Sequence, residues 1–241
     1  MSQSRRPLVY AHRGASADFP ENTLDAFGGA VEQGADGVEL DVRLNAAGEL
    51  IVHHDAWYRD GRTVWDVVLA AAPPGTCDLG AALDACTGIR VNVEIKNDPA
   101  DLGGDHVRWS VEPADAVVEL LAARRAVGAV DDVIVSSFDP ATLDRVLAVR
   151  PDLPTGALLG DLRTDPGAVD RAADAGHGAV HPWEPFVDEA FVDRCRGLGL
   201  AINTWTVDDP DRIVALGGLG VDGVITNTPG AARNVLDRLG G

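Results

Sequence analysis

The sequence is poor in cysteine and contains a single lysine. Its three cysteines, Cys77, Cys86 and Cys195, are odd in number and show no C-x-x-C spacing. This pattern argues against a disulfide framework and against a cysteine-ligated zinc cluster. We therefore expect reduced, partly buried thiols. The one lysine is Lys96, whereas every other basic residue is arginine, so a compact ammonium group at this position indicates a specific role.

Long apolar runs are also missing. No stretch approaches the roughly 20 apolar residues of a membrane helix, and residues 1–7 contain no apolar signal core. These absences predict a protein with no stable membrane insertion and a cytoplasmic location. Glycine-rich nucleotide loops and the G-x-S-x-G motif of acyl-transfer enzymes are absent too. Hydride transfer and acyl transfer are therefore not indicated.

Positive charge is scarce relative to negative charge. The chain has 20 lysines and arginines against 38 aspartates and glutamates, a net charge of −18. This balance disfavours nucleic acid as a partner, because phosphate backbones are bound through basic side chains. A small anionic substrate is still compatible, provided that local cations or a metal ion overcome the general field.

Strand-like and helix-like segments alternate along the 241 residues. Eight strands are expected to begin near residues 8, 38, 89, 133, 155, 178, 200 and 223. Alternation favours a parallel sheet covered by helices, and eight such strands close a (β/α)8 TIM barrel. We predict one barrel domain over residues 1–241, with a shortened irregular insertion at about 55–88 after the second strand. An open doubly wound sheet also alternates, but no nucleotide loop follows any strand.

Periodicity and end signals give the expected helices. They span residues 23–34, 79–85, 113–127, 141–149, 166–175, 188–197, 209–216 and 230–239. Residues 97–104 are expected to form a polar loop. Residues 50–55 are predicted to be a further strand, joined to the second strand by a turn at 45–48.

Polar residues interrupt two otherwise apolar strands. Glu39 and Asp41 lie two apart and share one strand face, as do Glu94 and Lys96. The working face of such a barrel lies at the C-terminal ends of its strands. We expect the three carboxylates to bind one divalent cation there, Mg²⁺ or Ca²⁺, because hard cations take oxygen ligands.

Basic side chains offer a different partner for these carboxylates. Arginines such as Arg13 or Arg43 can neutralise them without a metal, and the sequence leaves this alternative open. Arg13 and Lys96 would also supply the positive charge that an anionic substrate needs. A metal, histidines and two basic residues together suit phosphate-ester cleavage, where charge stabilisation is the main task.

Histidines follow two of the strands. His12 and either His53 or His54 are candidates for general base and general acid, because imidazole titrates near neutral pH. His53 and His54 alternate along the chain, so only one faces the barrel mouth, and strand parity does not decide which. His181 is either a packed imidazole or a neighbour of the site. Trp205 is either an apolar wall over the site or a core residue at the rim.

Several stretches of the chain together resemble the glycerophosphodiester phosphodiesterase family. They are Ala11–Gly14, Pro20–Thr23, Gly34–Val42, His54–Asp55, Val93–Lys96, Ser137–Phe138 and Trp205–Val207. The resemblance covers essentially the whole chain, and the combination of His-Arg-Gly, Glu-Asn-Thr and Glu-x-Asp is highly specific. It implies a (β/α)8 barrel and metal-dependent hydrolysis of glycerophosphodiesters to sn-glycerol 3-phosphate and an alcohol.

The resemblance also implies a mechanism, in which His12 and His54 are the acid–base pair. The free glycerol hydroxyl attacks phosphorus, a cyclic phosphate forms as the alcohol leaves, and water then opens the ring. The other expected site residues are the metal ligands Glu39, Asp41 and Glu94, the phosphate or substrate contacts Arg13, Lys96 and Trp205, and four nearby residues without a defined role, Glu21, Asn22, His181 and Asn203.

The chain departs from the family pattern in two places. The segment from Asp55 to about Leu79 is shorter than the subdomain of many members, and Asn227 stands where the family often has aspartate. Two alternative functions are a barrel phospholipase of C or D type and a barrel that binds metal and phosphodiester without turnover. The acidic chain shows no basic or apolar rim of the kind expected for lipid substrates. The sequence does not indicate an oligomeric state.

Overall fold

Eight parallel strands form a closed ring in the computed structural model, which describes residues 6–97, 106–129 and 132–239. The ring closes because β1 pairs with both β2 and β10. Its strands are β1 Leu8–His12, β2 Gly37–Leu44, β5 Arg90–Ile95, β6 Val133–Ser137, β7 Thr155–Leu159, β8 Ala179–Pro182, β9 Ala201–Thr204 and β10 Gly223–Thr226. This confirms the predicted TIM barrel and its eight strand positions.

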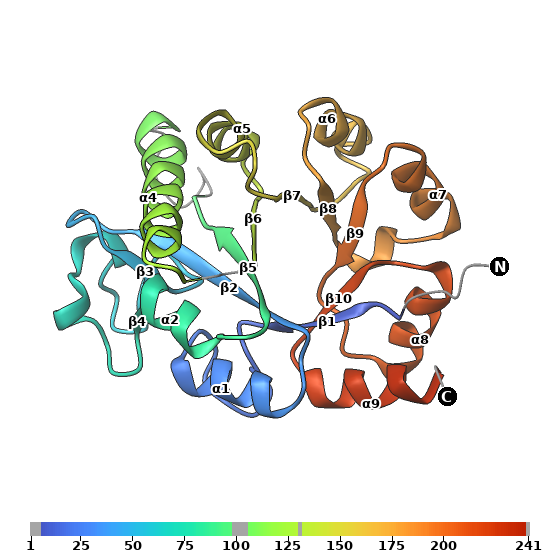
Figure 1. Cartoon of the computed structure of the whole chain (residues 1–241), viewed down its shortest axis with the longest axis horizontal. Helices are drawn as coiled ribbons and strands as arrows, with labels where there is room; N and C mark the ends of the chain where they lie inside the picture. Colours follow the sequence, from blue (N-terminus) through green and yellow to red (C-terminus); the bar gives the residue numbers. More distant parts are fainter. Residues whose placement is uncertain (1–5, 98–105, 130–131, 240–241) are drawn as a thin grey trace.

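Helices surround the ring (Figure 1). They are α1 Leu24–Glu32, α2 Leu79–Ala85, α4 His106–Ala126, α5 Pro140–Val149, α6 Ala168–Asp174, α7 Glu189–Gly197, α8 Pro210–Leu219 and α9 Pro229–Leu239. Local sequence starts several of them. The side chains of Thr23, Asp139, Asp188 and Asp209 accept hydrogen bonds from backbone N–H groups in the first turns of α1, α5, α7 and α8. Among the described helices, none has both the length and the apolar character needed to cross a membrane.

The expected start of α4 was wrong. A helix beginning at Pro113 was predicted because proline favours the first turn. The observed helix begins at His106 and carries Pro113 inside it. Ala114, Val117 and Leu121 are buried in the core, so packing stabilises this helix despite the hydrogen bond that the proline removes. The expected polar loop falls largely on residues 98–105, outside the described part of the chain.

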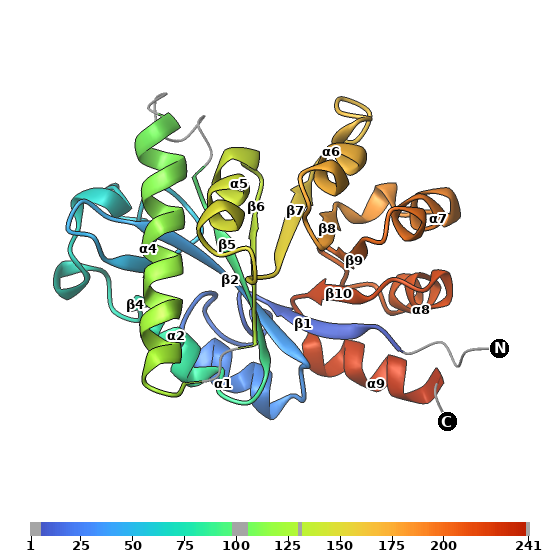
Figure 2. The same ribbon diagram turned by 45° about the horizontal axis from the view of Figure 1, so that its top comes forward.

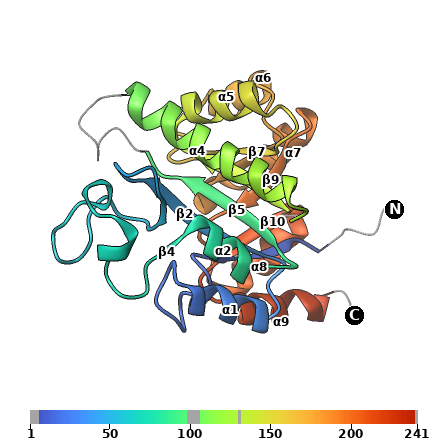
Figure 3. The same cartoon turned by 60° about the vertical axis from the view of Figure 1, so that its left-hand side comes forward.

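A hairpin extends β2 beyond the ring. Its second strand, β3 Leu50–Val52, runs antiparallel to β2 and pairs in turn with β4 Cys77–Asp78. The segment between them contains two short 3-10 helices, η1 Val64–Asp66 and η2 Leu69–Ala71, and packs over its own small core around Ile51. Figures 2 and 3 show this insertion beside α2 and α4, to one side of the barrel.

The predicted strand 50–55 is too long at its end, since β3 stops at Val52. Beyond it, Arg43 fixes the backbone: its Nε and Nη2 both donate to the carbonyl oxygen of His54, at 2.9 and 2.7 Å. The backbone N–H of His53 still donates to the carbonyl oxygen of Asp41 at 3.0 Å, so the Arg43 side chain replaces the strand ladder only at His54. His54 therefore lies beyond the strand pairing, where strand alternation no longer governs the orientation of its side chain.

Candidate active site

The register of β1, β2 and β5 brings the polar strand residues together. His12 pairs with Glu39 across β1 and β2, and Asp41 pairs with Glu94 across β2 and β5. Ligand oxygens of Glu39, Asp41 and Glu94 all lie within 4.8 Å of one another, and all three residues are buried. The structure thus places the three predicted carboxylates in one cluster.

Two basic side chains, Lys96 and Arg13, contact this carboxylate cluster. Lys96 Nζ lies 2.8 Å from Glu94 Oε1 and 3.9 Å from Asp41 Oδ1. Arg13 Nε lies 3.3 Å from Asp41 Oδ2. The alternative of neutralisation by arginine therefore holds in part for Asp41, through Arg13, and Arg43 donates to the carbonyl oxygen of His54. Buried carboxylates are costly without such partners.

Only one of the two carboxylate oxygens of Glu39 has a hydrogen-bond donor among the described residues. Its Oε2 accepts from the backbone N–H of Arg13 at 3.0 Å, but its Oε1 is buried with no hydrogen-bond partner among the described residues. Burial, and then the charges of Asp41 and Glu94, raise the pKa of Glu39 well above its ordinary value. An unpartnered buried oxygen beside two other carboxylates fits a divalent cation, and the all-oxygen donor set is the one that Mg²⁺ and Ca²⁺ prefer.

The three carboxyl groups differ in protonation. Burial, and then Asp41, raise the pKa of Glu94 to about 7. Burial would also raise the pKa of Asp41, but Lys96 and Arg13 outweigh it and lower that pKa. In the folded protein without a cation, Glu39 and Glu94 therefore keep their protons to higher pH than Asp41 does.

Cation affinity should accordingly depend on pH. Glu94 must lose its proton to bind a cation, so the affinity for Mg²⁺ is expected to rise between about pH 6 and pH 8, with release of protons. Calorimetry in two buffers with different ionisation enthalpies measures both effects. An affinity independent of pH, with no proton release, would contradict this protonation scheme.

The raised pKa of Glu94 also predicts how the stability of the metal-free protein changes with pH. The folded pKa of Glu94, about 7, exceeds the ordinary value of 4.5, so the folded state holds more protons than the unfolded state between these values. The contribution of Glu94 to stability is therefore complete at lower pH and is lost as pH rises through this window. Thermal unfolding of metal-free protein at several pH values checks this trend.

His12 points toward the carboxylate cluster. Its Nε2 lies 3.9 Å from Glu39 Oε2, and its Nδ1 lies 2.8 Å from Asn227 Oδ1. Burial, and then the positive charge of Arg13, lower the pKa of His12. A neutral imidazole with one nitrogen held by Asn227 and the other directed at the cluster is suited to proton transfer.

His53 and His54 have different surroundings. The His53 ring packs on Tyr58, with centroids 4.7 Å apart, and its Nε2 lies 3.4 Å from the carbonyl oxygen of Trp57 in the insertion. His54 Nδ1 lies 2.7 Å from Asp55 Oδ1. Burial raises the pKa of Asp41, but the charges of Lys96, Arg13 and, to a smaller extent, His54 lower it. These contacts associate His53 with the insertion, whereas the His54 ring pairs with the neighbouring Asp55.

The loop after β1 carries Arg13, Glu21 and Asn22 to the site. Arg13 and Asn22 both have φ of 57°, a left-handed conformation that costs energy in non-glycine residues. Asn22 Nδ2 donates to Asp41 Oδ2 at 2.8 Å, and Arg13 Nη1 lies 3.1 Å from both carboxylate oxygens of Glu21. Contacts with the carboxylate cluster thus hold this strained loop in place.

His181 and Asn203 form a separate pair inside the barrel. Asn203 Nδ2 lies 3.1 Å from His181 Nε2. A side chain at Gly156 would place its Cβ 2.5 Å from the same nitrogen, so glycine makes room for the ring. Burial lowers the pKa of His181 to about 4. These contacts favour a neutral, packed imidazole among the interpretations that the sequence left open.

Aromatic residues line one side of the barrel mouth. Trp205 Nε1 donates to the carbonyl oxygen of His181 at 2.7 Å, and its ring meets the Phe138 ring edge-on with centroids 5.6 Å apart. Lys96 Nζ lies 5.6 Å from the Phe138 centroid. Phe138 and Trp183 are 46% and 40% exposed. The sequence proposed Trp205 for this wall but missed Phe138 and Trp183, although Phe138 lies in a stretch that carries the family resemblance.

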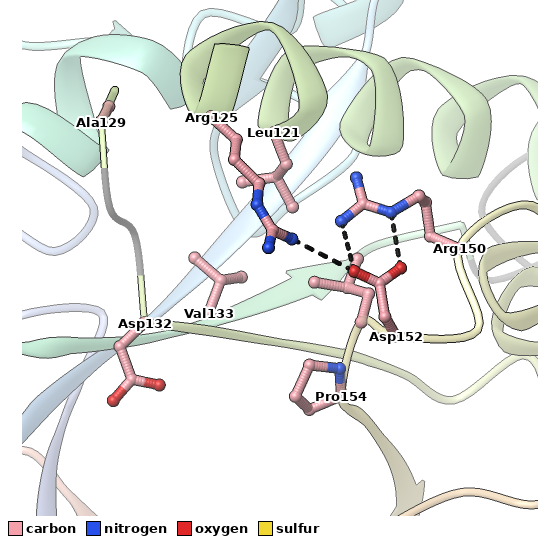
Figure 4. Close-up of a pocket in the computed structure, with 9 residues that line it drawn as sticks. Leu121, Arg125, Ala129, Asp132, Val133, Arg150, Asp152 and Pro154 are labelled. Carbon is pink, nitrogen blue, oxygen red and sulfur yellow. Dashed lines mark hydrogen bonds and ion pairs between the residues drawn. The ribbon is translucent and has the colours of Figure 1, made fainter. Parts of the chain in front are cut away.

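A cavity of about 380 Å³ lies at the opposite end of the barrel, where the strands begin. Figure 4 shows the side chains that line it. Val133 and Pro154, at the beginnings of β6 and β7, help to line it. Its arginines are already paired: Arg150 makes two contacts with Asp152, at 2.8 and 2.9 Å, and Arg125 lies 3.2 Å from the same carboxylate. In this fold that end generally serves stability, so the cavity is not a candidate for the catalytic site.

Comparisons with known proteins identify the family of this chain. Residues 12–231 match the Glycerophosphoryl diester phosphodiesterase family. A glycerophosphodiester phosphodiesterase of Caldanaerobacter subterraneus subsp. tengcongensis is 31% identical, with 98% of this chain and 100% of that protein covered. A probable glycerophosphodiester phosphodiesterase 1 of Mycobacterium tuberculosis is 32% identical, covering 96% and 93%.

The fold comparison gives the same result. The crystal structure of a putative glycerophosphoryl diester phosphodiesterase from Silicibacter pomeroyi superposes with a TM-score of 0.84 at 28% identity. The match covers 98% of this chain and 94% of that one. Since the family match extends over most of the barrel, this chain belongs to the glycerophosphoryl diester phosphodiesterase family.

Proposed function

We propose that this chain hydrolyses glycerophosphodiesters to sn-glycerol 3-phosphate and an alcohol, using one divalent cation. The observation that carries the proposal is the buried carboxylate cluster, with His12 beside it, in a member of this family. Both the relatives' names and the donor chemistry support a phosphoric diester hydrolase. We also propose a cytoplasmic location, consistent with the three buried, free cysteines.

Glu39, Asp41 and Glu94 would hold the cation, either Mg²⁺ or Ca²⁺. When bound, a divalent cation polarises a phosphoryl oxygen and lowers the pKa of a nearby hydroxyl. Lys96 has three donor protons, so it can keep its contact with Glu94 while it donates to the substrate phosphate. Arg13 offers a second, planar donor, which Glu21 orients from the rim.

The two histidines would divide the proton transfers. In the first step the glycerol hydroxyl attacks phosphorus, one histidine accepts the hydroxyl proton, and the other protonates the departing alcohol. The product of this step is a cyclic phosphate. In the second step the roles reverse: water is deprotonated, attacks phosphorus and opens the ring. Trp205 and Phe138 would lie beside the substrate and limit access of water from their side of the mouth.

A substrate panel tests the proposal. Purified protein should release sn-glycerol 3-phosphate from glycerophosphocholine or glycerophosphoethanolamine in Mg²⁺ or Ca²⁺, and EDTA should abolish the release. Hydrolysis of micellar phospholipid without hydrolysis of the soluble diesters would favour the phospholipase alternative. Binding of metal and diester without product would identify a non-catalytic barrel.

A further inference from the structure

Asn227, just after β10, links His12 to a carboxylate that sequence reasoning did not include. Its Oδ1 lies 2.8 Å from His12 Nδ1, and its Nδ2 donates to Asp208 Oδ2 at 2.7 Å. The same Asp208 carboxylate accepts from the backbone N–H of Asn227 and from the Thr226 hydroxyl, both at 2.8 Å. His12 and Asp208, 196 positions apart in the numbering, are thus joined by one amide side chain.

The carboxylate determines which way the amide faces. An ionised carboxylate only accepts hydrogen bonds, so the atom 2.7 Å from Asp208 Oδ2 must be the NH₂ group of Asn227. The opposite orientation would set two oxygens against each other at that distance. A second contact agrees, since the Ser16 hydroxyl donates to Asn227 Oδ1 at 2.9 Å. The amide therefore presents its oxygen to His12.

An acceptor at Asn227 Oδ1 selects one form of the neutral His12 ring. If Nδ1 lacked a proton, two acceptors would face each other at 2.8 Å. We propose that Asn227, oriented by Asp208, holds neutral His12 in the Nδ1–H tautomer, so that the free electron pair of Nε2 faces the carboxylate cluster. Asn227 and Asp208 are then positioning residues, and the inference rests on the proposed function only for its catalytic consequence.

In the reaction, this tautomer makes Nε2 the atom that accepts a proton. The hydroxyl proton moves to Nε2 while the oxygen forms its bond to phosphorus, and Nδ1–H keeps its bond to Asn227 throughout. The opposite tautomer would direct an N–H at the nucleophile and could not accept its proton. For His12 to act as a base, the orientation of its ring is therefore not enough. The ring must also be in the Nδ1–H tautomer, which the Asn227 amide selects.

The pairing also accounts for asparagine at position 227. Aspartate would likewise accept from His12 Nδ1, but it would bring a second carboxylate against Asp208 at 2.7 Å. Exchanging the two side chains should remove this repulsion. In the double variant Asn227→Asp with Asp208→Asn, the carboxylate faces His12 and the amide donates to it from position 208.

Nitrogen NMR of histidine-labelled protein tests the tautomer directly, in the metal-free and the Mg²⁺-loaded protein. We expect His12 to show a protonated Nδ1 and an unprotonated Nε2, and Asn227→Leu to give a mixture of both tautomers. Steady-state kinetics should show kcat reduced by about 10- to 100-fold in Asn227→Leu with little change in KM. The double exchange should recover most of kcat, whereas Asn227→Asp alone should not.

Asp211→Asn is the matched control for the change made at Asp208 in the double variant. It removes one negative charge from the first turn of α8 and should leave the His12 signals unchanged. A protonated Nε2 with an unprotonated Nδ1 in the wild-type protein would overturn the inference, even if Asn227→Leu failed to fold. An unaltered tautomer and kcat in folded Asn227→Leu would also overturn it. Because the NMR result does not depend on turnover, failure of the proposed function would remain distinguishable from failure of this inference.

Discussion

Replacing His12 or His54 by alanine is expected to lower kcat for glycerophosphodiester hydrolysis by at least about 10²-fold, the usual scale for a lost general acid or base. His12 Nε2 lies beside the carboxylate cluster, and the charge of His54 acts on Asp41. Each truncation removes one proton carrier while the cation ligands stay in place. KM should change little, because neither imidazole is proposed as a main phosphate contact.

His53→Ala is the matched control for this prediction. His53 is adjacent in sequence, but its ring packs on Tyr58 in the insertion. We expect this variant to retain kcat within a few-fold of the unaltered protein. Full activity in His12→Ala or in His54→Ala would refute the role assigned to that residue. Loss of activity in His53→Ala but not in His54→Ala would reverse the choice between the two.

Glu39→Gln is expected to cause the second large loss, about 10³-fold or more in kcat, because a cation ligand is removed without changing side-chain size. The expected effect on stability has the opposite sign. Burial and the neighbouring Asp41 and Glu94 raise the pKa of Glu39, so a neutral amide removes a repulsion from the metal-free fold. Metal-free Glu39→Gln should therefore melt at or above the temperature of the wild-type protein.

Thermal unfolding with and without the cation shows whether Glu39→Gln removes a cation ligand or disrupts the fold. At a Mg²⁺ concentration about 100 times Kd, the wild-type protein should gain about 2.7 kcal/mol, and Glu39→Gln should gain far less. Glu32→Gln makes the same chemical change on the exposed surface of α1 and should behave as wild type. An undiminished cation-induced shift in Glu39→Gln would remove Glu39 from the proposed ligand set.

Features that depend on nearby residues could be predicted from the sequence. The spacing of Glu39 and Asp41 placed two carboxylates on one strand face, and alternation of strands and helices indicated the barrel. Such patterns are readable because strand pleat, helical periodicity and capping involve residues only a few positions apart. Local preference also misled: Pro113 suggested a helix start, but the helix begins before it, where Ser110 is buried and its carbonyl oxygen accepts from the Thr142 hydroxyl of α5.

Features that depend on closure of the barrel were decided only by the tertiary structure. Arg43 binds the backbone of His54 and ends the strand that sequence alternation had extended. Phe138, Trp183 and Trp205 lie at the same rim because they directly follow the C-terminal ends of β6, β8 and β9. The contact from His12 through Asn227 to Asp208 joins the first strand to the last. The sequence by itself determined the barrel and its unusual polar residues. Which of these polar residues contact one another, and how His12 is oriented, was decided only when the barrel closed, because these hydrogen bonds join residues that are far apart in the sequence.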